Sequence, residues 1–341
     1  MATVKELAEY TGFSITTISR VLNNDPTMNV SDTTRSVILE AAGKLHYRTS
    51  RAASRSRAGR GRQLKIGLAE MLSPLEQLED PYYMYLKNYS LQHFADAGCA
   101  VIPLIWDQSA YLPSSSEKLD GILAIGIFSD AQTNSLASLS SSVIFLDSAP
   151  DELRFDSVVL NFQLGVEQAV DYLIAHGHRE IGFLGPCRKL DQKKRPAPEV
   201  RREFFIQSMK ERGLFRSEYM LDASPMTSAA SRKYLTQRLA QGGPMPTAIL
   251  AANEEAAIGA AGALRSSGLS IPKDLSIISF NDTPLSALTD PPLTSISSHV
   301  DAMSATAIHM LLQRISGQAP EIPLKVMVPP TLIVRESVRT F

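Results

Sequence analysis

Apolar residues follow two different spacings along the chain, and the change near residue 64 divides it into two parts. Before that point they recur every three or four residues, which predicts short amphipathic helices. After it, unbroken apolar runs alternate with helical stretches, a pattern typical of parallel strands buried on both faces. The predicted strands are 64–69, 100–106, 121–127, 142–147, 157–162, 180–185, 247–253 and 275–282, and the predicted helices are 82–97, 163–176, 199–212 and 254–267. The sequence therefore predicts a small all-α head and an α/β body with doubly wound parallel sheets.

The head contains two short helices joined by a tight turn. Thr3 and Glu6 have the spacing of a capping box at the start of the first helix, and Gly12 supplies a residue suited to its end. Ser14 begins the second helix, whose inward stripe is Ile18, Val21 and Leu22. A third helix, capped by Ser31, carries a further stripe of Val37, Ile38, Ala41, Ala42 and Leu45. Three such helices can share one miniature core, and this arrangement predicts a helix-turn-helix head.

The outer face of the second helix has side chains suited to DNA bases. Arg20 can donate two bonds to guanine, Thr16 can bond either base, and Ile15 can pack on a thymine methyl group. An amphipathic helical hairpin with a solvated face would show the same pattern. The candidate DNA-contacting residues of the head are Thr3, Ser14, Ile15, Thr16, Thr17, Ser19, Arg20 and Asn23.

A basic segment follows the head. Residues 48–62 hold six arginines, no acid and no large apolar side chain, so they cannot form a core of their own. Residues 1–63 hold ten Lys/Arg against five Asp/Glu, whereas the remainder holds 24 against 30, so a basic head is joined to an acidic body. A positive charge placed on the small domain favours binding to phosphates, although an ordinary basic linker remains an alternative.

Several classes of protein are disfavoured by composition. The 341 residues are 44% hydrophobic but contain no long apolar run, signal peptide or transit segment, so a cytoplasmic protein that does not enter a membrane is expected. Only Cys99 and Cys187 occur, which favours reduced, buried thiols over a disulfide framework or a zinc site. The six histidines form no catalytic pattern, so neither an enzyme nor a cofactor is predicted.

Polar residues stand at the ends of several predicted strands. Asp147 follows one, Asn253 follows a second and Asn281 follows a third, at the sheet edge where open α/β sheets bind ligands. Each of them could instead be a helix cap or part of an Asx turn. Together their amide and carboxylate oxygens suit the hydroxyl groups of a sugar, and no phosphate-binding loop is present.

The chain resembles the lactose-repressor/galactose-repressor family of bacterial transcription regulators over essentially its whole length. The resemblance lies in the segments TVKELAEYTGFSITTISRVLN, VSDTTRSVILEAAGKLHY, LIAHGHREIGFLG, PTAILAANEEAAIGAAGALRSSGLSIPKDLSIISFND and PPLTSI. DPYY at 80–83 and NNDPTMNV at 23–30 are most similar to a branch that regulates β-galactosidase genes. The family implies a two-lobed body like a type I periplasmic binding protein, a homodimer, and a small effector, such as a sugar, that changes affinity for a double-stranded DNA operator.

The resemblance also implies domain limits. It places the head at 1–48, a basic hinge at 49–63 and the effector-binding and dimerisation body at 64–341. Within the body the first lobe would comprise about 64–161 and 297–324, and the second about 162–293 and 325–338.

Site residues can be matched to the family one position at a time. Ile15, Thr16 and Arg20 match base-reading positions. The matching effector-binding positions are Asp147, Arg201, Asn253 and Asn281, with Arg202 as a rival to Arg201 because Phe204 replaces the usual glycine. Tyr82 and Tyr83 could line the cleft or pack in the core. Two positions at which many relatives carry an aromatic residue hold Thr227 and Val300, so no stacked sugar ring is predicted. The candidate effector residues are Asp147, Arg201, Asn253, Asn281, Tyr82 and Thr227.

The hinge departs from the family pattern. Ser56 occupies the position of the leucine that usually wedges into the minor groove and kinks the DNA. The neighbouring Arg51, Arg55 and Arg57 can instead hold a narrow groove by charge, which predicts weaker operator bending.

The function expected is that of an effector-responsive transcription regulator, in which a sugar or galactoside releases a repressor from its operator. Two alternatives remain open from the sequence. One is a sugar-binding protein of other purpose, and the other is a regulator corepressed by a non-sugar effector.

Overall fold

The computed structural model describes residues 4–22, 30, 34, 37–38, 41 and 62–341. These residues divide into two units, 1–63 and 64–341, which agrees with the predicted limit between hinge and body. In the described part of the chain no helix is both long and apolar enough to cross a membrane.

The head is built on helices α1 (Val4–Thr11) and α2 (Ile15–Leu22). Leu7, Ile18 and Val21 are buried together with Ile38 and Ala41, so the predicted third helix does contribute to a shared core. Val37 was predicted to belong to the same stripe, but its side chain is 47% exposed because it precedes Ile38 and faces another side of the helix. Ser31, Ala42 and Leu45 lie outside the described residues.

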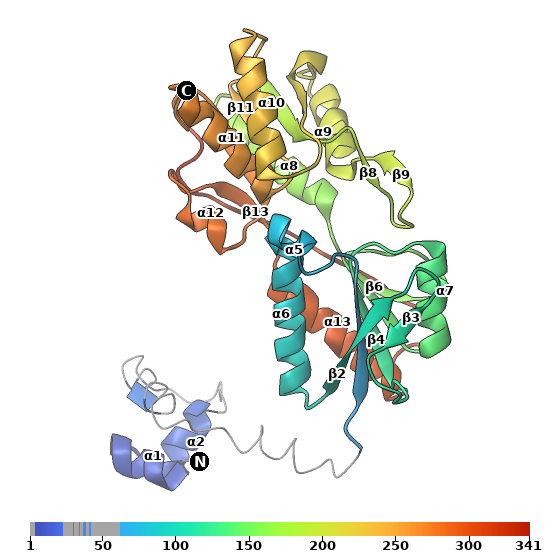
Figure 1. Ribbon diagram of the computed structural model, residues 1–341. Helices are drawn as coiled ribbons and strands as arrows, with labels where there is room; N and C mark the ends of the chain where they lie inside the picture. The colour runs from blue at the N-terminus through green and yellow to red at the C-terminus, as the bar shows by residue number, and fades with distance from the viewer. Residues whose placement is uncertain (1–3, 23–29, 31–33, 35–36, 39–40, 42–61) are drawn as a thin grey trace. The chain divides into compact units, whose positions relative to one another are not determined.

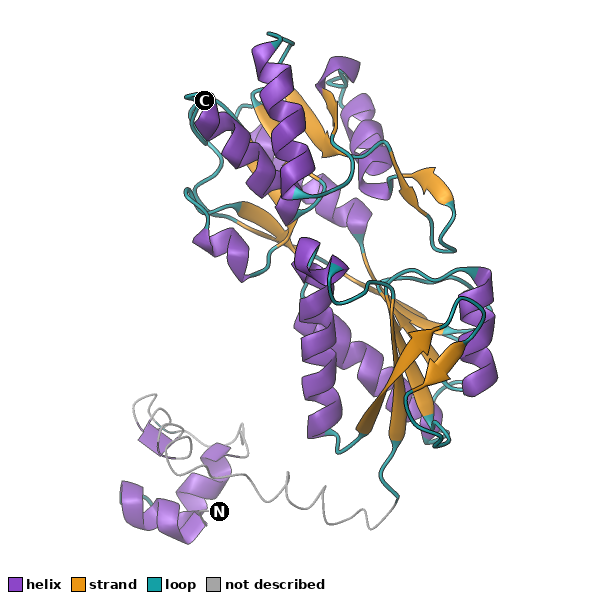
Figure 2. Cartoon of the chain, in the orientation of Figure 1, coloured by secondary structure: helices purple, strands orange, loops and turns teal. Residues whose placement is uncertain are grey.

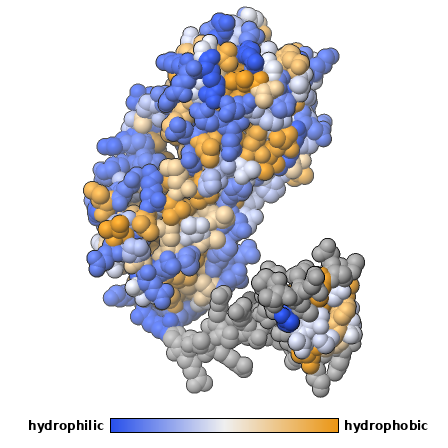
Figure 3. Space-filling model, turned by 180° about the vertical axis from the view of Figure 1, so that it is seen from behind, coloured by the Kyte–Doolittle hydropathy of each residue, from blue (hydrophilic) through white to orange (hydrophobic). Residues whose placement is uncertain are grey.

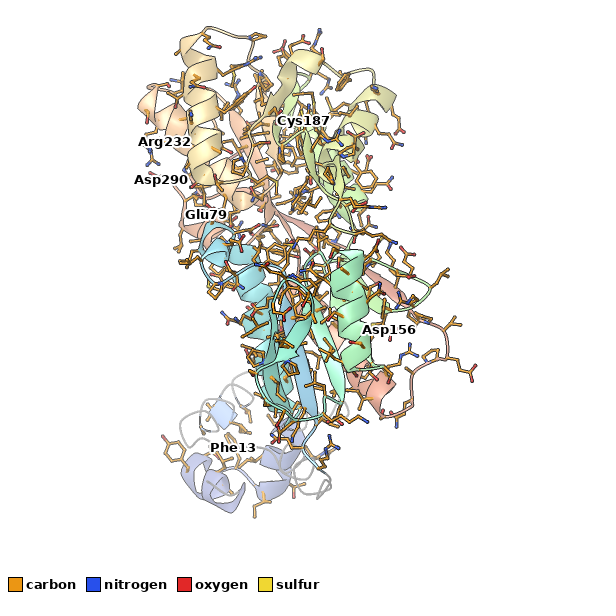
Figure 4. All side chains as sticks on the ribbon, turned by 45° about the vertical axis from the view of Figure 1, so that its right-hand side comes forward. Phe13, Glu79, Asp156, Cys187, Arg232 and Asp290 are labelled. Carbon is orange, nitrogen blue, oxygen red and sulfur yellow. The ribbon has the colours of Figure 1, made fainter. Side chains whose placement is uncertain are left out.

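The first lobe of the body is a seven-stranded sheet in the order β14-β6-β5-β4-β1-β2-β3, parallel except at β3. Helices α6 and α13 cover one face and α7 covers the other (Figures 1 and 2). Its strands are β1 (Lys65–Glu70), β2 (Ala100–Trp106), β3 (Tyr111–Pro113), β4 (Gly121–Ile125), β5 (Val143–Leu146), β6 (Asp156–Leu160) and β14 (Lys325–Val328). Its helices are α5 (Glu76–Glu79), α6 (Pro81–Asp96), α7 (Asp130–Leu139) and α13 (Val300–Ile315). Asp156, labelled in Figure 4, binds Arg314 of α13 through two bonds of 2.8 Å and fixes that helix to β6.

The second lobe is a six-stranded sheet in the order β10-β7-β11-β12-β13-β15, parallel except at β15. Helices α8 and α9 pack on one face, and α10 and α11 pack on the other. Its strands are β7 (Ile181–Gly185), β10 (Met220–Asp222), β11 (Ala248–Ala251), β12 (Ser276–Asn281), β13 (Thr294–Ser297) and β15 (Thr331–Ile333), with a separate hairpin of β8 (Arg188–Leu190) and β9 (Pro196–Pro198). Its helices are α8 (Phe162–Ala175), α9 (Val200–Glu211), α10 (Ser228–Ala240), α11 (Glu254–Ser266), α12 (Pro284–Leu288) and the 3-10 helix η1 (Ser217–Tyr219).

The chain crosses between the lobes three times, after β6, after β13 and after β14. The last crossing corrects the predicted limits, which assigned 325–338 to the second lobe. Strand β14 pairs in parallel with β6 of the first lobe, with Val326 opposite Val158, because Val326 and Val328 add apolar side chains to that lobe's core. Only the segment after β14 returns to the second sheet.

On the face shown in Figure 3, hydrophilic side chains cover much of the body, and apolar ones gather in separate patches. Both cysteines are free, as expected, but neither is fully buried. Cys99 is half-buried, and Cys187 (Figure 4) is exposed because it lies in the turn that leads from β7 to the β8–β9 hairpin.

The contact between α10 and α11 depends on a glycine. A Cβ atom at Gly259 would come within 2.9 Å of the Ser231 Cβ atom and would overlap the carbonyl oxygen of Ser228. We expect Gly259→Ala to lower the free energy of unfolding by about 1–3 kcal/mol, because the two helices would have to separate. Urea denaturation of the full chain would measure this change.

Gly262, one turn further along α11, is the matched control. A Cβ atom there would meet only the Arg232 side chain, at 3.5 Å. Gly262→Ala should leave stability unchanged or raise it by about 1 kcal/mol, since alanine is the better helix former. Equal denaturation midpoints for the two variants would contradict the account of this helix contact.

Candidate DNA-binding head and effector site

The structure confirms the predicted start of the second helix in the head. The Ser14 hydroxyl accepts a bond of 3.1 Å from the Thr17 amide and lies 2.8 Å from the Thr17 hydroxyl, so Ser14 is the N-cap of α2. Ile15, Thr16 and Arg20 are exposed on this helix, as base-reading side chains must be. The turn before it contains Gly12 at φ +74°, a conformation that favours glycine.

Other predicted DNA contacts stay untested. Ser19 belongs to α2, but its side chain is outside the described part. The remaining predicted contacts that fall outside the described residues are Thr3, Asn23, Arg51, Arg55, Ser56 and Arg57.

A small chamber between the two lobes brings together most of the predicted effector residues. It is lined by five of the six, contributed by both lobes, and its volume is about 30 Å³. The five are Tyr82, Asp147, Arg201, Asn253 and Asn281. We call this space the inner chamber.

Asp147 is the acidic group of the inner chamber. It follows β5 at φ +73°, a conformation that aspartate tolerates better than most residues, and this turns its side chain into the space between the lobes. Its carboxylate accepts bonds from the hydroxyls of Tyr82 at 3.1 Å and Tyr83 at 2.9 Å. Burial raises the pKa of Asp147, while Lys189 and the tyrosine hydroxyls act in the opposite direction. Both tyrosines thus line the chamber and also pack in the core of the first lobe.

Arg201 is the buried cation of the chamber. Its side chain bonds Glu199 at 2.7 Å and lies over the ring of Phe162, with 5.0 Å between the guanidinium carbon and the ring centroid. Arg201 is 5% exposed and lines the chamber, whereas Arg202 does not line it. The choice of Arg201 over Arg202 is therefore supported by its position.

The two asparagines reach the chamber from neighbouring strands. Asn253 follows β11 and caps α11 through a bond of 2.9 Å from the Ala256 amide, while its own amide donates to the Met226 carbonyl at 3.0 Å. Asn281 ends β12 at φ +95°. The alternative interpretation of Asn253 as a helix cap is thus confirmed, and the residue lines the chamber as well.

A second cavity of about 370 Å³ adjoins the inner chamber, and we call it the outer cavity. The sixth predicted residue, Thr227, lines this cavity and caps α10 by accepting a bond from Ala230 at 3.3 Å. The two spaces share Asp80, Tyr83, Lys189 and Met226.

Sequence reasoning did not identify Asp80 or Lys189 as site residues. Asp80 was noticed only as part of DPYY, and Lys189 lies in a charged stretch typical of a solvated loop. Burial raises the pKa of Asp80 and lowers the pKa of Lys189. Among the described residues, no group of three His, Cys, Asp or Glu side chains is placed to hold a metal ion.

The β8–β9 hairpin carries Lys189 and joins the second lobe to the first (Figure 1). Gln192, at its tip, accepts a bond of 2.7 Å from the Ala149 amide of the first lobe. Lys193 lies 3.5 Å from Asp130, the first residue of α7. The hairpin therefore closes one side of the space between the lobes.

Comparisons with known proteins agree with this architecture. A model of bacterial regulatory proteins of the lacI family matches residues 3–50, and a model of a periplasmic binding protein-like domain matches residues 170–338. Among solved structures, the lac repressor dimer bound to operator and the anti-inducer ONPF is similar over 99% of both chains, with a TM-score of 0.64 and 23% identity. The transcriptional regulator CelR in complex with cellobiose is similar over 99% of this chain and 100% of that one, with a TM-score of 0.65 and 20% identity.

Curated relatives match along the whole chain. The HTH-type transcriptional regulator GalR of Lacticaseibacillus casei is 29% identical over 99% of each chain. The HTH-type transcriptional regulator GanR of Bacillus subtilis (strain 168) is 30% identical, again over 99% of each chain. With this identity along nearly its whole length, a matching head and a two-lobed body, the chain belongs to the lacI family of bacterial regulatory proteins and is a DNA-binding regulator, not an enzyme.

Proposed function

We propose that the protein is a repressor that binds operator DNA through its head and releases it when a sugar binds between the lobes of its body. The observation that carries this proposal is the inner chamber, in which five predicted effector residues from both lobes converge. Carboxylate, amide and guanidinium groups are suited to the hydroxyls of a sugar. A protein of similar fold supports the same class of effector, because CelR was solved with cellobiose.

A ligand in this position can act as a switch. It would touch Asp147 of the first lobe and Arg201 and Asn253 of the second, so its affinity depends on how the lobes are arranged. A ligand shifts a conformational equilibrium only by the difference between its affinities for the two states. Contacts to both lobes provide such a difference.

We infer that the protein works as a cytoplasmic homodimer. One small head reads few base pairs, and two heads related by symmetry would read a palindrome with half-sites about one helical turn apart. The lac repressor, which has a similar fold, was solved as a dimer on its operator.

To test the switch, the purified full chain is first used to select DNA that it binds from a random pool. We call this the recovered DNA. Affinity for that DNA would be measured by fluorescence anisotropy with and without galactose, glucose, lactose, cellobiose and melibiose. We expect at least one sugar to weaken DNA binding about fivefold or more, the range of typical allosteric coupling. A sugar that strengthens binding would show corepression, and the absence of an effect from every sugar would contradict a sugar effector.

The base-reading assignment can be tested at Arg20. Arg20→Ala should weaken binding to the recovered DNA by about 1–3 kcal/mol and relax specificity at one base pair, because a bidentate contact to a base is lost. Binding to random DNA should change much less. Replacing Arg55 and Arg57 should instead weaken binding to all DNA and reduce the dependence on salt.

The control for Arg20 is Arg216→Ala, which removes an exposed arginine from the body. It should leave both affinities unchanged. If Arg20→Ala lowered the affinity for recovered and random DNA equally, this residue would contact phosphates only.

A further inference from the structure

Three polar groups that line the inner chamber already have partners within the protein. Both carboxylate oxygens of Asp147 accept tyrosine hydroxyls, Arg201 is paired with Glu199, and both ends of the Asn253 amide are bonded. The volume of about 30 Å³ corresponds to the space of about one water molecule. The inner chamber can therefore receive one end of a ligand, and the rest must lie elsewhere.

The outer cavity has the room that the inner chamber lacks. Its volume of about 370 Å³ falls in the range of small-molecule sites. One wall is apolar and suits the C–H face of a sugar ring. This wall consists of Met71, Leu72, Ile127, Leu190 and Met226.

Two groups without partners lie where the spaces meet. The Oδ1 atom of Asp80 is buried and has no hydrogen-bond partner among the residues that the structure describes. The ammonium group of Lys189 forms no ion pair with any residue in the described ranges, although it lines both spaces. Because the Oδ1 atom of Asp80 is buried, its missing hydrogen bond costs free energy that a ligand can recover. A hydroxyl group fits both, since it can donate to the carboxylate and accept from the ammonium group.

The charges around the outer cavity favour a neutral ligand. The carboxylates of Glu76, Glu79 and Asp80 line it, against the two cations Lys189 and Lys194. Glu79 lies near the boundary of the two lobes (Figure 4). A phosphate or carboxylate group would meet no excess of positive charge there.

We propose that the outer cavity is a second compartment of the effector site and that the effector is a neutral sugar of two linked units. This proposal rests on the proposed sugar effector. One end of the ligand reaches the inner chamber, and its second unit fills the outer cavity against the apolar wall. Asp80 and Lys189 bind its hydroxyls at the junction and select for two units over one.

The first test uses calorimetric titration to measure how tightly the full chain binds several sugars, each titrated separately. The probes are galactose, glucose, lactose, cellobiose, melibiose and glucose 6-phosphate. We expect one disaccharide to bind about tenfold more tightly than either of its component sugars. Equal affinity for a disaccharide and its components would overturn the second compartment but leave a sugar effector in place. If glucose 6-phosphate bound most tightly, the effector would not be a neutral sugar. If no sugar bound, both the proposed sugar effector and the second compartment would be overturned.

The second test uses variants that affect the two compartments differently. Leu190→Trp places a large ring in the outer cavity and should weaken disaccharide binding about tenfold while leaving monosaccharide binding within about threefold. Lys189→Met should weaken disaccharide binding about tenfold, because the hydrogen bond from the charged ammonium group is lost. Disaccharide binding that is unchanged in both variants would refute the proposal.

Two control variants accompany this test. Leu153→Trp adds the same ring at a leucine that is 90% exposed and lines neither space. Arg188→Met removes a cation from the same strand as Lys189, but from an exposed side chain. Both should bind the disaccharide as the wild type does.

A third variant separates a ligand-binding role of Asp80 from a structural one. Asp80→Asn removes a buried charge that lacks one partner, so it should raise the thermal unfolding midpoint of the sugar-free protein by about 2 °C while weakening disaccharide binding. A residue that only supports the fold would lower the midpoint when changed. A lower midpoint with unchanged disaccharide affinity would exclude Asp80 from the site.

Discussion

Charges of opposite sign face each other across the space between the two lobes. The acids Asp80 and Asp147 come from the first lobe, and the cations Lys189 and Arg201 come from the second. Removing such groups from water costs several kcal/mol per ion unless each charge finds a partner. The raised pKa of both acids and the lowered pKa of Lys189 reflect that cost. The arrangement of the lobes is therefore tied to the electrostatics of this space, and a polar ligand that enters it changes both.

The topology explains why these groups meet. In each lobe parallel strands end at the same edge, and the residues just beyond that edge include Asp147 after β5, Asn253 after β11 and Asn281 at the end of β12. Three crossings join the lobes, so the edges face each other while the two cores stay separate. The β8–β9 hairpin then adds a direct contact through Gln192 and Lys193. A ligand bound here would be held by both lobes.

Much of this fold could be predicted from the sequence because burial imposes clear patterns. All eight predicted strands exist, since each is an apolar run in the centre of a sheet. The strands that were not predicted are short or lie toward sheet edges. For example, β14 reads KVMV and alternates exposed with half-buried positions. The local pattern of β14 does not show that it pairs with β6, and the predicted limits therefore assigned it to the wrong lobe.

The residues of the candidate site likewise include some that the sequence could predict and some that it could not. Asp147, Asn253 and Asn281 were predictable because they follow buried strands, and Arg201 because of its place in a family motif. Lys189 was not, because KLDQKKRPAP has the composition of a solvated loop and only tertiary contacts turn one of its lysines inward. Asp80 was missed for a related reason: the sequence does not show which polar atoms lack partners.

The central claim is that sugar binding between the lobes and DNA binding by the head are coupled. The most direct measurement is the affinity of the full chain for its sugar, with and without saturating operator DNA. Linkage requires each ligand to change the affinity of the other by the same factor. The account predicts that operator DNA weakens sugar binding by the factor with which the sugar weakens DNA binding. A sugar affinity that is the same with and without operator DNA would contradict it.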